Sequence, residues 1–200
     1  GITFQSDAGA FTIGGNRITL LGGTVANSSS NLQTLNLDMI LSGGSTCTVA
    51  GGDITLNGIL SDSGRLTKTG NGTLTLTAAS TYTGATTFSD GTIVLAASGS
   101  LTATQSLITN GIANLDIHGA ITLAADATGV FGVGYAGSGG TSTVTVHPGG
   151  SLSVGNGGGR TFIGGGPSGG PYGTGILTMA GGTCTVAAGS AFPNGYVYLA

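Results

Sequence analysis

The residues best suited to acid and base chemistry in this chain are Asp116 and His118, which are separated by one isoleucine. Side chains two residues apart point to the same face of a strand, so a strand here would place the carboxylate beside the imidazole. Such a pair could act as general acid and base in the cleavage of a polysaccharide. A hydrolase or lyase is therefore one hypothesis, with Asp116 and His118 as its candidate residues.

A site that cleaves acidic polysaccharides would need further charged groups beside this pair. Stacked strands could in principle bring Asp53 and Asp90 near Asp116, with Arg65 next to them. The sequence, however, contains no Asp-Asp pair and no Arg-x-Lys. An alternating Asp and His is also typical of the solvent face of a strand. We therefore predict no catalytic residue and no enzymatic activity, and the lyase or hydrolase is the least favoured alternative.

The sequence also lacks the spacing of a metal or nucleotide site. His147 stands before Pro148 in a turn-like segment, with no second His or Cys at a metal-ligand spacing. Residues 132–137 spell G-x-G-x-x-G, but no helical pattern follows, as a dinucleotide site would require. The glycines at 164–170 lack the aspartates of a calcium-binding roll. We expect no metal and no cofactor.

The two cysteines, Cys47 and Cys184, each stand two residues before a valine in an alternating segment. They share the strand phase of these valines, which predicts small buried core residues. In a stack of coils, two cysteines so far apart in the sequence would lie about 25 Å from each other. This exceeds the roughly 7 Å Cα limit of a disulfide, so no intrachain bridge is expected.

The composition narrows the range of partners. Charged residues make up 6% of the chain, its net charge is −3, and its four Lys and Arg are scattered. Nucleic acids are bound by clustered cations, so no nucleic-acid partner is expected. No apolar run approaches the roughly 18 residues of a membrane helix. The first residues do not resemble a signal peptide, which we expect to be absent or removed.

Apolar and small polar residues alternate along the whole chain, which is typical of strands that show one face to a core. Turns rich in glycine separate these segments, and glycine supplies 42 of the 200 residues. Helical spacing is not sustained anywhere. Clear strand patterns occur at 54–56, 74–76, 121–123 and 152–154. The sequence therefore predicts an all-β fold.

The region from 130 to 200 is rich in glycine and contains an internal repeat. The repeat pairs 143–146 with 176–179, 149–154 with 181–186, and 161–164 with 196–199. Three short strands separated by glycine turns, at a period of about 32 residues, are typical of one coil of a solenoid. We predict one β-solenoid segment over residues 1–200, with about eight coils of three short strands each.

In such a stack, alternate apolar positions point inward. The predicted core residues are Leu74, Leu76, Ile93, Leu95, Val144, Val146, Leu152, Val154, Leu177 and Cys184. Alanine pairs at 96–97 and 124–125 blur the alternation. The register of the coils between residues 96 and 130 therefore stays open.

One segment, LTKTGNGTLTLTAASTYTGATTFSDGTIVL at 66–95, resembles the autotransporter-associated β-strand repeat. The resemblance is carried by the L-x-K-x-G-x-G-T-L-x-L core at 66–76 and by Y-T-G at 82–84. Ser80 and Phe88 depart from the usual asparagine and aliphatic residue, which affects packing only. The resemblance implies a right-handed parallel β-helix in a secreted or surface-displayed bacterial protein, with no catalytic residues from the repeat.

Both ends of the sequence read as strands without a protective helix or charged edge. Solenoid ends are normally capped, so we expect either a piece of a longer passenger or copies that pair end to end. The weakly charged surface favours end-to-end or lateral self-association, because little repulsion opposes it. The leading hypothesis is a structural, extracellular β-solenoid that forms a surface stalk or a self-assembling fibre.

An adhesin-like passenger is the alternative hypothesis. Tyr82, Tyr135 and Tyr172 lie in turn-like segments, where exposed aromatic rings could contact a host surface or stack on the sugars of a glycan. These tyrosines are the candidate contact residues.

Overall fold

The computed structural model of the protein describes residues 1–102, 105–123, 130–135, 140–154, 160–165, 173–185 and 195–199. Every regular element in these residues is a β-strand, and the paired strands run parallel. No helix in the described part is long and apolar enough to cross a membrane. The prediction of an all-β parallel solenoid is confirmed.

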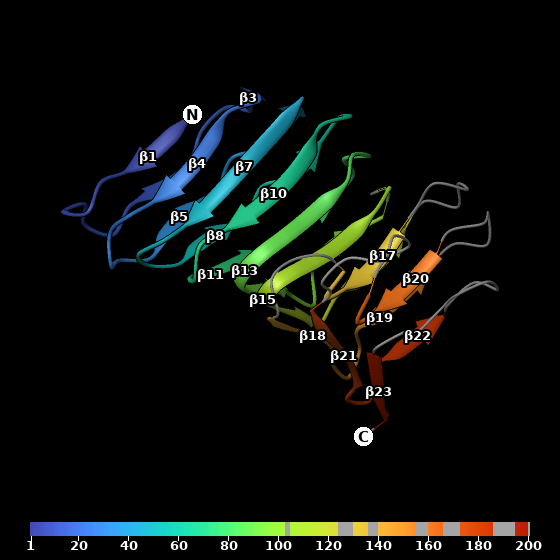
Figure 1. Ribbon diagram of the computed structural model, residues 1–200. Coiled ribbons are helices and arrows are strands. Elements are labelled where there is room, and N and C mark those ends of the chain that lie inside the picture. Colours follow the sequence, from blue (N-terminus) through green and yellow to red (C-terminus); the bar gives the residue numbers. More distant parts are fainter. Residues whose placement is uncertain are drawn as a thin grey trace.

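The strands form ladders on three faces of the solenoid, and the first ladder is seen side by side in Figure 1. It consists of β1 (Ile2–Phe4), β4 (Thr24–Asn27), β7 (Gly44–Val49), β10 (Arg65–Thr69), the first part of β13 (Thr86–Leu95), the first part of β15 (Leu107–Ile117), β17 (Val130–Val133) and β20 (Arg160–Ile163). β13 and β15 are long because each turns the corner into the second face without a break.

The second ladder contains the later parts of β13 and β15. Its other strands are β2 (Thr12–Ile13), β5 (Gln33–Leu35), β8 (Ile54–Leu56), β11 (Thr73–Leu76), β18 (Thr141–Val146), β21 (Thr174–Met179) and β23 (Gly195–Leu199). Along β11, threonines that are half-buried alternate with leucines that are fully buried. This is the pattern that a strand with one face on a core requires.

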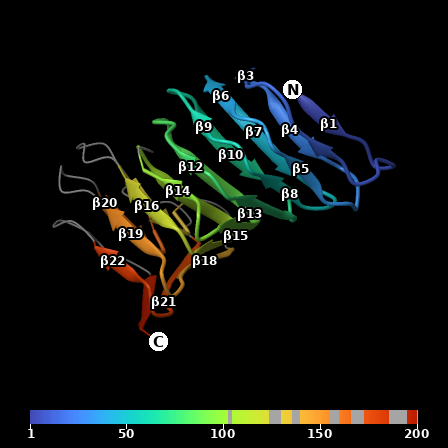
Figure 2. The same cartoon turned by 180° about the vertical axis from the view of Figure 1, so that it is seen from behind.

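The third face is visible from behind in Figure 2 and is split into two sheets. The first sheet holds β3 (Ile18–Leu21), β6 (Met39–Ser42) and β9 (Leu60–Ser61). The second holds β12 (Ala79–Ser80), β14 (Ser100–Leu101), β16 (Ala120–Leu123), β19 (Ser151–Val154) and β22 (Thr183–Thr185).

One strand from each face makes a coil. About six turns, from β1 to β16, are described nearly without a gap, slightly fewer than the eight coils expected, and β17 to β22 continue all three ladders beyond them. The pairing also fixes the register that the sequence left open, because Leu95 pairs with Ile117 and Leu101 with Ile121.

Coil length differs along the chain. Gly44 pairs with Arg65 in the next coil, whereas Thr141 in the glycine-rich region pairs with Thr174, a much longer step along the sequence. The longer step matches the repeat period of the glycine-rich region. The strands thus keep their place in the ladder although the step along the sequence becomes longer.

The apolar side chains form one core that runs through the stack. The structure buries Leu74, Leu76, Ile93, Leu95, Val144, Val146, Leu152, Val154 and Leu177. Cys184 packs against this core but is half-buried, so it is less covered than the other predicted core residues. It lies in β22, which pairs with β19 and with no further strand among the described residues.

Candidate functional site

The corner between β10 and β11 holds a buried lysine inside the segment 66–95. Lys68 has 0% of its surface exposed and is paired with Cys47 in the preceding coil and Phe88 in the following one. Its ammonium group donates a hydrogen bond to the carbonyl of Gly70 in its own coil and another, of 2.8 Å, to the carbonyl of Asp90 in the next. One side chain therefore joins two coils at this corner.

Burial changes the pKa values of Lys68 and its neighbour Cys47. It lowers the pKa of Lys68 from its ordinary value, and the nearby Cys47, Asp90 and Asp53 oppose this change in part. Burial raises the pKa of the Cys47 thiol to about 12, with Lys68 opposing it. Cys47 is therefore a neutral thiol at physiological pH and acts as a small core residue, not as a nucleophile.

Glycines make room for the lysine. Gly70 and Gly91 have φ values of 81° and 74°, in the left-handed region that disfavours other residues. A Cβ atom on Gly91 would lie 2.6 Å from Lys68 Nζ and 2.5 Å from the Gly70 carbonyl oxygen. A Cβ on Gly70 would lie 2.5 Å from the carbonyl oxygen of Val49 in the preceding coil. Glycine at both positions is thus a packing requirement, because the backbone of the preceding coil and, at Gly91, the ammonium group fill the space of a side chain.

Aspartates near this corner tie successive coils together. The Asp53 carboxylate accepts a 2.7 Å hydrogen bond from the backbone N–H of Thr73, and the Asp90 carboxylate accepts a longer one, 3.4 Å, from Ile112. Asp116 lies elsewhere, in β15, where it pairs with Thr145 of β18. No group of three metal-ligating side chains occurs in the part of the chain that the structure describes. The hypothesis that stacking gathers three aspartates into one acidic site is therefore wrong.

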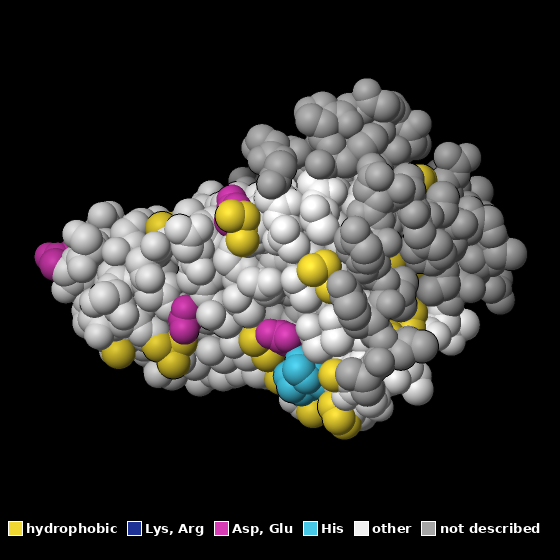
Figure 3. All heavy atoms as spheres, turned by 60° about the horizontal axis from the view of Figure 1, so that its bottom comes forward, with side chains coloured by type: hydrophobic (Ala, Val, Ile, Leu, Met, Phe, Trp, Pro, Cys, Tyr) yellow, Lys and Arg dark blue, Asp and Glu magenta, His cyan; other side chains and the backbone are white. Residues whose placement is uncertain are grey.

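The two histidines meet on the outside of the second ladder. Asp116 Oδ1 lies 3.0 Å from His147 Nε2, and the imidazole rings of His118 and His147 stack with centroids 4.1 Å apart and planes 7° apart. Figure 3 shows the histidines beside an acidic side chain on this face. Asp116 lies in β15, which ends at Ile117, so His118 follows the strand, and both side chains contact His147. His147 is therefore not an isolated turn residue.

The Asp116 carboxylate and the His147 imidazole form a hydrogen-bonded pair at the surface of the solenoid. Both Asp116 and His147 are about one third exposed, so water competes for their hydrogen bonds. The ladder pairing decides the contact, because it sets Val146 beside Ile117 and so places His147 beside His118. The arrangement stabilises neighbouring coils and does not by itself define a reaction.

Of the candidate contact tyrosines, Tyr82 is buried, contrary to what the adhesin hypothesis requires. Tyr82 is 1% exposed, its hydroxyl lies 2.5 Å from Thr86 Oγ1, and burial raises its pKa. It cannot reach a partner, because it fills the turn that leads into β13. Tyr135 is half-buried and packs edge to face on Phe162, with ring centroids 5.5 Å apart. Tyr172 lies outside the described residues.

Comparison with known proteins identifies one segment. Residues 66–95 match the passenger-associated-transport-repeat family. No curated protein and no solved structure matches the chain. The matched residues run from β10 through β13, so they contain Lys68, both glycines of its corner and the buried Tyr82. The chain is therefore a parallel β-solenoid in which one segment, residues 66–95, is similar to the passenger-associated-transport repeat.

Proposed function

We propose that the protein is a structural, non-enzymatic β-solenoid of the cell exterior that serves as a stalk or as a unit of a fibre. The observation that carries this proposal is the continuity of the first ladder through the transport repeat. β7, β10, β13 and β15 pair in sequence without a gap, and the core follows them. Mechanical load along the axis would therefore be shared by backbone hydrogen bonds and by the apolar core.

Location outside the cell is supported by the repeat and by the surface. The matched family is described as associated with passenger transport. The outer strand faces carry mainly Ser and Thr, and charged residues make up only 6% of the chain. β-branched threonine suits an exposed strand face. Such a surface adds little repulsion between neighbouring rods.

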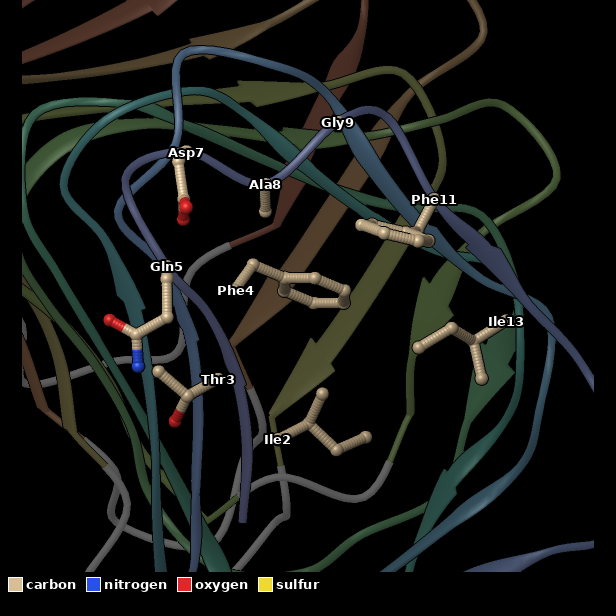
Figure 4. A pocket seen from close by; sticks show the side chains of 9 residues that line it. All are labelled: Ile2, Thr3, Phe4, Gln5, Asp7, Ala8, Gly9, Phe11 and Ile13. Atoms are coloured by element: carbon tan, nitrogen blue, oxygen red, sulfur yellow. The ribbon is translucent and has the colours of Figure 1, made fainter.

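Self-association is supported by the first coil, which has an apolar hollow of about 550 Å³. Figure 4 shows Ile2, Phe4, Phe11 and Ile13 around this hollow. The rings of Phe4 and Phe11 stack with centroids 6.1 Å apart, and Phe11 is 52% exposed. We assign the hollow to a coil of a second copy, because a parallel strand placed beside β1 would extend the first ladder and cover these side chains.

Sedimentation velocity tests this contact. The chain is expected to form larger species as its concentration rises, and Phe11→Asp is expected to keep it monomeric because it places a charge in the apolar hollow. Ile112→Asp is the matched control, since Ile112 is 65% exposed in β15, away from the first coil. If the wild-type chain stays monomeric as its concentration rises, the fibre hypothesis is excluded and the stalk remains as the proposed function.

Electron cryo-microscopy of the native material distinguishes the two architectures directly. In a fibre, strand spacing of about 4.8 Å continues across the junction between copies. In a stalk, rods stay separate and stand on the cell surface. Rods that are neither stacked nor attached to a surface would overturn the structural proposal.

An assay for polysaccharide cleavage tests the proposal that the protein is not an enzyme. We expect the purified protein to release no oligosaccharide from acidic polysaccharides. Release that is lost in Asp116→Asn would show that the Asp116, His118 and His147 cluster is catalytic and would overturn this part of the proposal.

A further inference from the structure

A second hollow, of about 350 Å³, lies at the corner where the third face of the solenoid turns into the first. It extends over the starts of β7, β10 and β13, which lie side by side in Figure 1. Its lining includes Gly43, Gly44, Gly84 and Ala85, whose side chains are absent or minimal. The floor of the hollow is therefore largely backbone, which a flat ligand could approach closely.

Arg65 and Ser63 form the polar wall of this hollow. Arg65 is the first residue of β10 and lies between Gly44 of the preceding coil and Ala85 of the next, whose carbonyl accepts a hydrogen bond from Leu66 N–H. The stem of the Arg65 side chain runs over Gly44, where a Cβ would lie 3.6 Å from Arg65 Cγ and Cδ, an ordinary van der Waals distance. Arg65 therefore lines the hollow beside residues with little or no side chain.

The charge of Arg65 is not neutralised locally. The described residues contain one ion pair, which joins His147 and Asp116 on another face. Arg65 is exposed, whereas Lys68 is buried under its corner. In a chain of net charge −3 with four Lys and Arg, an unpaired guanidinium in a hollow attracts an anion.

The backbone of the turn before Arg65 is strained, and this turn carries Ser63, which lines the hollow. Asp62 has a φ of 82° and is the one residue other than glycine with positive φ in the described part of the chain. Its carboxylate accepts a 2.8 Å hydrogen bond from Ser63 N–H, and its carbonyl accepts a 2.9 Å bond from Thr83 N–H in the next coil. Backbone strain of this kind is concentrated at ligand clamps and other functional sites.

We propose that this hollow binds a carboxylated sugar residue of an acidic saccharide. A guanidinium group recognises a carboxylate through two parallel hydrogen bonds, which suits Arg65. The Ser63 hydroxyl and the polar side chain of Gln105, which also lines the hollow, match the hydroxyl groups of a sugar ring. The volume lies at the lower end of the range of small-ligand sites. The site is independent of the contact between copies at the first coil.

Nuclear magnetic resonance titration of the ¹⁵N-labelled chain tests the proposal. The probe is a trimer of galacturonic acid, and the same trimer as its neutral methyl ester is the ligand control. We expect the acidic trimer to shift the amide signals of Ser63, Arg65, Gly84 and Ala85, and the ester to bind at least tenfold more weakly. Shifts of equal size with the ester would overturn recognition of the carboxylate.

Two variants separate a specific site from general attraction of anions. Arg65→Gln is expected to weaken binding of the acidic trimer at least tenfold, whereas Arg17→Gln, which removes an equal charge from an exposed position in the first coil, is expected to leave it unchanged. Equal losses in both variants, or the same shifts with sodium sulfate at matched ionic strength, would reduce the hollow to a nonspecific anion contact. Sedimentation of Arg65→Gln should match the wild type, so failure of this site is distinguishable from failure of fibre assembly.

Discussion

The ammonium group of Lys68 donates a 2.8 Å hydrogen bond to the backbone carbonyl of Asp90, one coil further along the solenoid. The same group bonds the Gly70 carbonyl within its own coil. A charged group inside the stack is thus used to fix the distance and register of two turns. This contact gives a physical reason for the lysine and the two glycines in the transport repeat.

Replacement of Lys68 by methionine should weaken the corner. Lys68→Met keeps the length of the side chain but leaves the Gly70 and Asp90 carbonyls without this donor. We expect the free energy of unfolding to fall by about 1–3 kcal/mol, as for other buried groups that lose a partner. Urea denaturation measures it, with Thr67→Ala on the outer side of the same strand as control. A Lys68→Met protein as stable as the wild type would show that the contact is not a clamp.

A pair of glycine substitutions separates backbone strain from crowding. Gly149 and Gly91 both have positive φ, at 83° and 74°, but a Cβ on Gly149 would have no atom within 4 Å. Gly149→Ala should therefore cost only about 1–2 kcal/mol of left-handed backbone strain. Gly91→Ala should cost at least twice as much, because its Cβ also meets Lys68 and Gly70. Thermal unfolding of the two variants checks the difference, and equal losses would contradict the crowding argument.

A charge in the core should disrupt several coils together. Leu76 is 2% exposed and pairs with Leu56 and Leu95 in the adjoining coils. Leu76→Asp buries a carboxylate without a partner, and a loss of more than about 4 kcal/mol is expected. Thr75→Asp, on the outer side of the same strand, should cost far less. Circular dichroism during denaturation compares them, and similar curves would be inconsistent with an inward-facing Leu76.

Alkaline pH should destabilise the fold through Cys47. Burial raises the pKa of this thiol from 9.0 to about 12, so the folded state keeps a proton that the unfolded state has lost between these values. Its contribution to stability is therefore fully present below the lower value and decreases by about 1.4 kcal/mol per pH unit as pH rises toward the higher one. Burial lowers the pKa of Lys68, which works in the opposite direction as pH approaches its ordinary value of 10.5.

Comparison with Cys47→Ala isolates the thiol, because the other titrating groups are common to both proteins. The difference in unfolding free energy between wild type and Cys47→Ala should be constant from pH 7 to 8 and should change steadily above pH 9. Parallel stability curves up to pH 11 would mean that Cys47 ionises freely in the folded chain.

Much of the fold was predictable because its signals are local. Leu74 and Leu76 alternate with threonines, and this period of two indicates a strand with one buried face whatever surrounds it. The spacing of lysine and glycines in 66–76 likewise identifies the transport repeat within one short segment. Alternation did not reveal how well each strand is covered by its neighbours. Cys184 is half-buried, and among the described residues its strand pairs with β19 alone.

Contacts between coils were harder to predict from the sequence. The step from one coil to the next is short where Gly44 pairs with Arg65 and long where Thr141 pairs with Thr174, so no fixed period aligns one turn with the next. The same pattern of turns that suggested an exposed Tyr82 is compatible with a ring folded inward, and only packing against the neighbouring strands decides between them.

The sequence by itself determined that the chain is an all-β solenoid with a transport repeat, because strand alternation and glycine turns are properties of neighbouring residues. The tertiary structure alone decided which residues meet across coils: Lys68 with the Asp90 carbonyl, His118 with His147, and Arg65 with the hollow beside Gly44. These contacts join residues that are a whole coil apart in the sequence, and their register depends on the conformation of every turn between them.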